Sequence, residues 1–230
     1  MPHKKHPTAA AFTLVELLVV VALVAALMLL GLAALEAARR SSLDARCSNN
    51  LRQLGVSIFA YSQDHQGCTP PRLLAQGTIP EAHRYWHRAL RYLGYLNTPL
   101  VNARKASIHY CPAFTYNTSD LDYGTNDQAY GLRRWHAPGR EWDFSQKLSI
   151  LEKPSEFFLL VDSYHMLNEE QAYFVRGGDT TWRVRLTHGG RANTLFADGH
   201  LAPMPRSYFE SVHLTQAEYT ESKAYRVWPE

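Results

Sequence analysis

The sequence has little net charge, and this shortage excludes one class of partner. Its 24 Lys and Arg residues exceed its 21 Asp and Glu residues by three, and Lys4 and Lys5 lie near the N-terminus. The rest of the chain therefore carries a net charge of only about +1, which does not indicate a nucleic-acid-binding surface. We expect no nucleic acid among the partners.

Cysteine is also scarce. Only Cys47, Cys68 and Cys111 occur, so an exported domain can form one disulfide and must leave one thiol over. A Cys68–Cys111 disulfide is one hypothesis, because both residues lie in loop-rich sequence near prolines, but sequence alone does not determine the pairing. Cys47 falls in a helical pattern, where a small buried residue is expected.

Residues 12–35 form one long apolar run, interrupted only by Thr13 and Glu16. As a helix at about 1.5 Å per residue, the run reaches roughly 36 Å, enough to cross a hydrocarbon core of about 30 Å. It is longer than the core of an ordinary secretory signal, and the small residues 9–11 precede it, so a cut after the run is not expected. An ionised Glu16 is costly in lipid and should have a partner or a function.

The start of this run, AFTLVE at residues 11–16, resembles the processing site of type IV prepilins and type II secretion pseudopilins. The usual pattern there is Gly followed by Phe-Thr-Leu-x-Glu and an apolar helix; here Ala11, which is also small, replaces the Gly. The resemblance implies that prepilin peptidase cuts between Ala11 and Phe12, removes residues 1–11 as a leader, and leaves Phe12 as an N-methylated first residue.

The same resemblance implies a structural subunit of a type IV pilus or type II secretion-like filament. Its helix would lie in the inner membrane as a single span, with the head extracytoplasmic, before entering a filament core. The implied partners are prepilin peptidase, like subunits, the inner-membrane assembly machinery and membrane lipid. Pairing of the Phe12 amine with Glu16 of a neighbouring subunit would neutralise two charges that are expensive in lipid. Neither an enzyme nor a cofactor is expected.

An uncleaved membrane anchor is the alternative. The chain would then be a monomeric, membrane-anchored extracytoplasmic binding protein or enzyme. Lys4 and Lys5 before the run and Arg39 and Arg40 after it give little bias in orientation. Glu16 distinguishes the two hypotheses, because a simple anchor does not need it.

The helical pattern continues beyond the apolar run. Its apolar residues recur every three or four positions, at Leu43, Cys47, Leu51, Leu54, Ile58 and Tyr61. We predict one helix over residues 12–66, with residues 12–35 as the transmembrane or filament-core part. Gly67 is expected to cap it, and Pro70 with Pro71 forbids its continuation.

Residues 67–230 are predicted to form one head domain, so that the fold is α+β: a pilin-like lollipop with a long helix and an antiparallel β-sheet head. A short helix is expected over residues 81–93 and ended by Gly94. Strands are expected over residues 108–111, 157–161 and 172–176. Residues 182–186 and 192–197, with a Gly189-Gly190 turn between them and a type I′ turn at Asp198-Gly199, predict a three-stranded antiparallel meander.

His188, followed after nine residues by Asp198 and Gly199, resembles the H-X9-DG signature of prepilin-type proteins. The segment from Cys47 and the pair Cys111-Pro112 resemble the same group. A regular hairpin would place His188 and Asp198 roughly 20 Å apart, which argues against a shared metal. We therefore expect Asp198 and Gly199 to supply turn geometry and His188 to cap a strand end.

Two further patterns have simpler explanations. A Ser163, His188, Asp162 triad can be drawn, but the sequence lacks the glycines of a nucleophile elbow. Asp120, Asp122 and Asp127 have the oxygen density of a calcium loop without matching an EF-hand. Turn chemistry explains these acidic residues without calcium.

Overall fold

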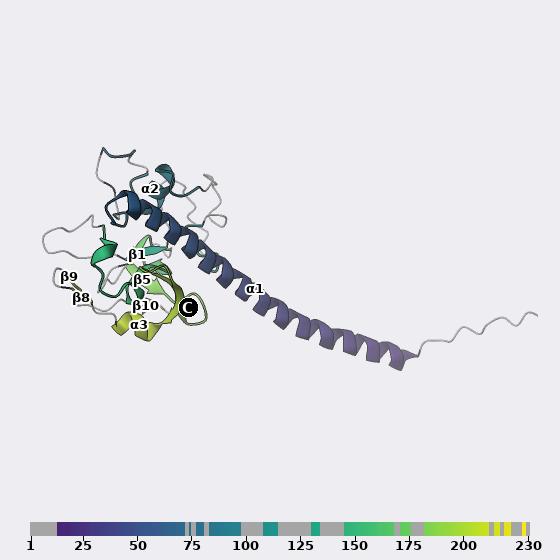
Figure 1. Ribbon diagram of the computed structural model, residues 1–230. Coiled ribbons are helices and arrows are strands. Elements are labelled where there is room, and N and C mark those ends of the chain that lie inside the picture. The colour runs from purple at the N-terminus through teal and green to yellow at the C-terminus, as the bar shows by residue number, and fades with distance from the viewer. Residues whose placement is uncertain are drawn as a thin grey trace, which may run out of the picture. The chain divides into compact units, whose positions relative to one another are not determined.

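Among the residues that it describes, the computed structural model has one long α-helix, two short α-helices, two short 3-10 helices and three β-sheets. The long helix, α1 (Leu14–Asp64), is labelled in Figure 1. The residues that the structure describes are 13–71, 74, 77–80, 83–97, 108–114, 130–133, 145–167, 171–175, 182–211, 214–216, 219–221 and 227–228. By its contacts the chain divides into two compact units, Met1–Ser42 and Leu43–Glu230. The latter is called the C-terminal unit below.

The long helix α1 runs without a break over Leu14–Asp64, 51 residues, which confirms the predicted continuous helix. Two left-handed residues, Gln66 (φ 56°) and Gly67 (φ 77°), follow the end of the helix, and the Gly67 N–H donates to the Ser62 carbonyl. The expected cap is therefore shared by both residues. The first part of the helix is long and apolar enough to cross a membrane, and its most apolar 18-residue window is wholly exposed.

Within the C-terminal unit, α1 contributes the predicted apolar stripe to the core. Cys47, Leu51, Leu54 and Ile58 are fully buried. They pack with the short helix α2 (Trp86–Tyr92) through Trp86, in the cluster that also holds Leu160 and Leu195 of the sheet described next. A Cβ at Gly55 would lie 2.7 Å from Leu195 Cδ2, so the glycine permits this close approach.

The five-stranded sheet has the order β4-β1-β2-β6-β7. Its strands are β4 (Phe174–Val175), β1 (Gly131–Arg133), β2 (Phe158–Val161), β6 (Arg191–Phe196) and β7 (Leu201–Pro205). The predicted central strand at 157–161 is thus confirmed as β2, and all four of its residues are buried. Since β1 and β4 are parallel, the sheet is mixed, which corrects the expectation of an antiparallel head but keeps the α+β class.

A second sheet has the order β10-β5-β3, made of β10 (Val227–Trp228), β5 (Trp182–Arg185) and β3 (Ser163–His165). β8 (Leu214–Gln216) and β9 (Tyr219–Glu221) form a separate pair. The predicted meander is therefore wrong: β5 pairs with β3 instead of β6, and only β6 and β7 form a hairpin. Sequence periodicity identifies strands but does not say which neighbour each one chooses.

The two faces of β6 have different coverings. Leu195 points into the cluster shared with α1, whereas the adjacent Phe196 packs with Phe209 of the short helix α3 (Arg206–Ser211). Alternation along a strand produces this division. Residues 108–111, predicted as a strand, contain turns and no strand, and the Tyr110 carbonyl accepts a hydrogen bond from the Asn50 side chain of α1.

Candidate functional site

The turn between β5 and β6 holds His188 at the edge of the core. Gly189 (φ 59°) and Gly190 (φ 75°) are both left-handed, as a type I′ turn requires, which confirms the predicted Gly-Gly turn. The His188 N–H donates to the Arg191 carbonyl at 2.9 Å, and the Arg191 N–H donates back at 3.3 Å. The backbone of His188 closes the turn, so its imidazole is available for other contacts.

Asp162 lies where the chain crosses from β2 in the larger sheet to β3 in the smaller one. Its N–H donates to the Asn193 carbonyl at 3.2 Å, and its own carbonyl accepts from the Arg185 N–H at 3.0 Å. Its Oδ2 accepts from the Asn193 N–H at 2.8 Å. The carboxylate is therefore fixed inside the protein, and Asp162 is only 1% exposed.

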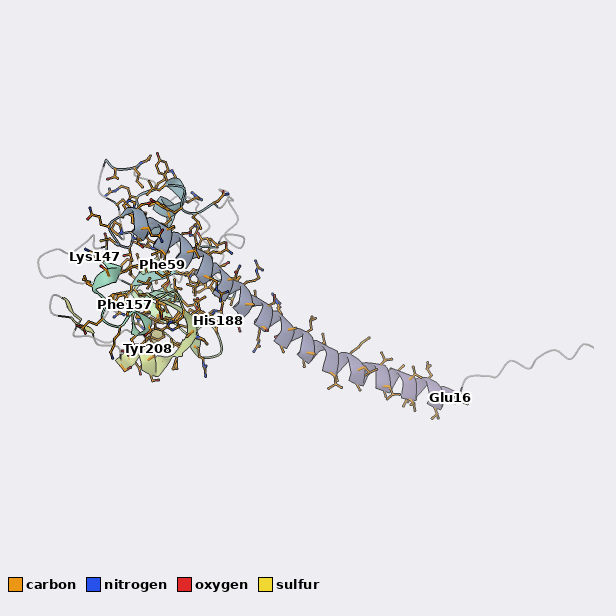
Figure 2. All side chains as sticks on the ribbon, viewed as in Figure 1. Glu16, Phe59, Lys147, Phe157, His188 and Tyr208 are labelled. Atoms are coloured by element: carbon orange, nitrogen blue, oxygen red, sulfur yellow. A yellow bond between two sulfur atoms is a disulfide. The ribbon has the colours of Figure 1, made fainter. Side chains whose placement is uncertain are left out.

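The imidazole of His188, a residue labelled in Figure 2, lies between two carboxylates and a sulfur atom. Its Nδ1 is 2.5 Å from Asp44 Oδ1, on α1, and its Nε2 is 3.2 Å from Asp162 Oδ2. The same Nε2 is 3.3 Å from Cys111 Sγ. The His188 side chain is 4% exposed and that of Asp44 is 50% exposed.

The two carboxylates keep His188 charged. Burial by itself lowers the pKa of an imidazole, but the hydrogen bond and charge of Asp162, followed by those of Asp44, raise the pKa of His188 to about 9. At neutral pH both ring nitrogens therefore carry protons and donate, Nδ1 to Asp44 and Nε2 to Asp162. The imidazolium thus joins α1 to the point where the two sheets meet.

The disulfide of the structure joins Cys47 of α1 to Cys111, across a separation of 64 residues. The Cys68–Cys111 hypothesis is therefore wrong, and Cys68 is a free thiol. Cys68 instead pairs through its backbone with Lys147. The reason is that Cys111 and Cys47 belong to one buried cluster, in which the Tyr130 hydroxyl donates to the Cys47 and Tyr110 carbonyls.

Asp198 and Gly199 shape the opposite end of β6 from His188. Gly199 has φ 91°, and Gln66 is the only described non-glycine residue with positive φ, so Asp198 is not left-handed. The Gly199 N–H donates to the Phe196 carbonyl, which makes a three-residue loop of type I turn plus left-handed Gly. The predicted type I′ form is thus wrong. Asp198 Oδ1 accepts from the His200 N–H and Nδ1 at 3.0 and 2.6 Å.

Of the possible Ser163, His188, Asp162 triad, the structure shows only the contact between Asp162 and His188. Asp162 and His188 do meet, but the Ser163 hydroxyl donates to the Ala172 carbonyl and not to His188. Ala11 and Phe12, and likewise Asp120, Asp122 and Asp127, lie outside the described residues, so the cleavage and calcium hypotheses stay predictions.

Glu16 forms a capping box with Thr13 at the start of α1. Its Oε2 accepts from the Thr13 N–H and hydroxyl, each at 2.8 Å, and its own N–H donates to Thr13 Oγ1 at 3.3 Å. Such reciprocal bonds satisfy N–H groups that a helix start leaves without partners. Glu16 thus has a local structural role that the sequence analysis did not consider.

Asp44 is the residue of the cluster that the sequence analysis missed. It lies three positions before Cys47, so both side chains occupy one helix face. An acidic residue on an otherwise apolar stripe is the signal that could have identified it.

Neither protein-family models nor curated proteins nor solved structures match this chain.

Proposed function

We propose that the chain is a pilin-like structural subunit of a type IV pilus or type II secretion-like filament, processed by prepilin peptidase at Ala11–Phe12. The observation that carries the proposal is the exposed apolar part of α1, which begins at Leu14 and has Glu16 in its first turn. Leu14, Leu27 and Leu30 are 79%, 69% and 71% exposed, like most apolar residues before Leu35. Apolar surface on this scale needs lipid or other subunits to cover it.

The continuity of α1 supports the same proposal. One helix supplies both the exposed apolar segment and, from Cys47 onward, a fully buried part of the C-terminal unit's core. No glycine or proline linker separates the two parts, because α1 is helical from Leu14 to Asp64. In a filament subunit, a continuous helix of this kind would join the part in the filament core directly to the head.

A membrane-anchored binding protein or enzyme is the second candidate, and the Thr13–Glu16 capping box favours it. The hydrogen bonds of the capping box give Glu16 a structural role in an uncleaved anchor, and this role does not require the amine of a neighbouring subunit. Two functions of Glu16 must therefore be separated: the cap, which needs its oxygen, and charge pairing with a neighbour, which needs its charge.

Two matched variants separate them. Glu16→Gln keeps an oxygen that can cap the helix but removes the charge, whereas Thr13→Ala keeps the charge and removes the two capping-box hydrogen bonds that involve the Thr13 hydroxyl. Both are expressed in the native host, and the amounts in the membrane and in sheared filaments are compared by immunoblot. We expect Glu16→Gln to remain in the membrane and to be lost from filaments, while Thr13→Ala assembles. Normal assembly of Glu16→Gln, or the absence of wild-type chain from filaments, would contradict the proposal.

A further inference from the structure

Three potential metal ligands converge in the core of the C-terminal unit, and Asp162 lies beside one of them, His188. Cys47 Sγ, Cys111 Sγ and a His188 ring nitrogen all lie within 4.8 Å of one another. Asp162 Oδ2 is 3.2 Å from His188 Nε2. Cys47, Cys111 and Asp162 are each at most 1% exposed, and the His188 side chain is 4% exposed. The four residues come from α1, the 108–114 segment, the β2–β3 crossing and the β5–β6 turn.

We propose that reduction of the Cys47–Cys111 disulfide converts this cluster into a binding site for one Zn²⁺, with Cys47, Cys111, His188 and Asp162 as its ligands. Two thiolates, one imidazole and one carboxylate are donors that zinc accepts in a tetrahedral site. The inference does not depend on the proposed filament function.

The two distances from His188 Nε2 to other proposed ligands fit a tetrahedral zinc site. Zinc–ligand bonds of about 2.0 Å to nitrogen and oxygen and about 2.3 Å to sulfur place neighbouring ligand atoms about 3.3 Å (N···O) and 3.6 Å (N···S) apart. The observed separations are 3.2 Å from Nε2 to Asp162 Oδ2 and 3.3 Å from Nε2 to Cys111 Sγ. The two sulfur atoms must separate to about 3.8 Å, a movement of the size that side-chain rotation supplies.

Two further contacts favour a metal at this place. The Asp44–His188 Nδ1 hydrogen bond is the kind of carboxylate–histidine contact that orients a zinc-binding imidazole and leaves Nε2 for the metal. Asp162 Oδ1 is buried and has no hydrogen-bond partner among the described residues, so the carboxylate has an oxygen to spare. A buried oxygen without a partner is costly, and a nearby cation would reduce that cost.

The conversion balances in electrons and protons. A dithiol or phosphine reductant supplies two electrons, and two protons from solvent complete the Cys47 and Cys111 thiols. Zinc then displaces both thiol protons and the Nε2 proton of His188, so three protons are released. The metal takes the place of the imidazolium charge beside Asp162. The disulfide and the metal exclude each other, because the sulfur atoms that bind zinc are otherwise joined in the S–S bond.

The test uses the full chain in detergent, reduced without oxygen and then freed of reductant. Zinc is measured as metal per chain, and Co²⁺ is used as a spectroscopic probe whose thiolate charge-transfer and d–d absorption identify a tetrahedral sulfur-containing site. We expect one metal per reduced chain and none in the oxidised chain. Cys68→Ser is the matched control, because this cysteine lies outside the cluster, and it should bind metal as the wild type does.

Two variants test the thiolate ligands, and a third tests the carboxylate that orients His188. Cys47→Ser and Cys111→Ser should lose the cobalt spectrum, and Asp44→Asn should weaken zinc binding by about 10- to 100-fold through the misplaced imidazole. If the reduced chain unfolds without metal, added zinc should restore its circular dichroism. The proposal is overturned if the reduced wild type binds no more metal than Cys47→Ser, if the oxidised chain binds equally, or if zinc fails to refold an unfolded reduced chain.

Discussion

Raising the pH should weaken the C-terminal unit by removing the proton that His188 holds between Asp44 and Asp162. The folded state raises the pKa of His188 to about 9, from an ordinary value of 6.5. A raised pKa means that the folded state binds the proton more tightly than the unfolded state does. The resulting stabilisation is therefore complete below pH 6.5 and is lost as the pH rises through 9.

The size of the effect follows from the same two values. The difference of about 2.5 pKa units corresponds to about 3 kcal/mol when His188 is protonated in both states. By linkage, most of this stabilisation remains at pH 7 and little of it remains at pH 9. Little discount for solvent applies on the histidine side, because its side chain is 4% exposed, although Asp44 is half exposed.

The assay is denaturant unfolding of the full chain in detergent from pH 6.5 to 9, for the wild type and for His188→Gln. The difference in unfolding free energy between them should shrink by about 2–3 kcal/mol over this range. Subtraction is needed because buried His87 and His109, whose pKa values burial lowers, take up protons on unfolding near pH 6.5. A difference that stays constant with pH would refute the assigned role of His188.

Two stability predictions follow from other contacts. Cys47→Ser removes the disulfide that closes a loop of 64 residues, and it should lower the unfolding free energy by about 4 kcal/mol in denaturant under oxidising conditions. Cys68→Ser, the control, should change the unfolding free energy by less than about 0.5 kcal/mol. Equal effects of the two substitutions would contradict the Cys47–Cys111 pairing. Gly131→Ala would place a Cβ 2.7 Å from both Ser163 Cβ and Val175 Cγ1. The substitution should therefore destabilise the sheet by about 1–3 kcal/mol, measured as a lower melting temperature. An unchanged melting temperature would show that the strands are less closely packed.

Local patterns allowed the sequence to predict the elements that depend on near neighbours. The apolar stripe of α1, the buried strand β2 and the Gly189-Gly190 turn each follow from spacing or turn chemistry within a few residues. Gly94 (φ 84°) likewise ends α2 as expected, with the Tyr95 N–H donating to the Leu90 carbonyl.

The long-range pairings could not be predicted in this way. Asp44 and His188 are 144 positions apart, and nothing local to either residue points to the other. The choice of Cys47 over Cys68 depends on how the 108–114 segment packs on α1, and the pairing of β5 with β3 depends on the chain crossing between sheets at Asp162. Periodicity gives the identity of an element and its buried face, whereas partners depend on the assembled core.

The most direct test of the proposed filament subunit is the mass of its N-terminal peptide, isolated from the native host. The proposal predicts N-methylated Phe12 as the first residue, with residues 1–11 removed. An N-terminus at Met1, or a cut after Leu35, would contradict it, because no amine would then be available at Phe12 to pair with Glu16 of a neighbouring subunit.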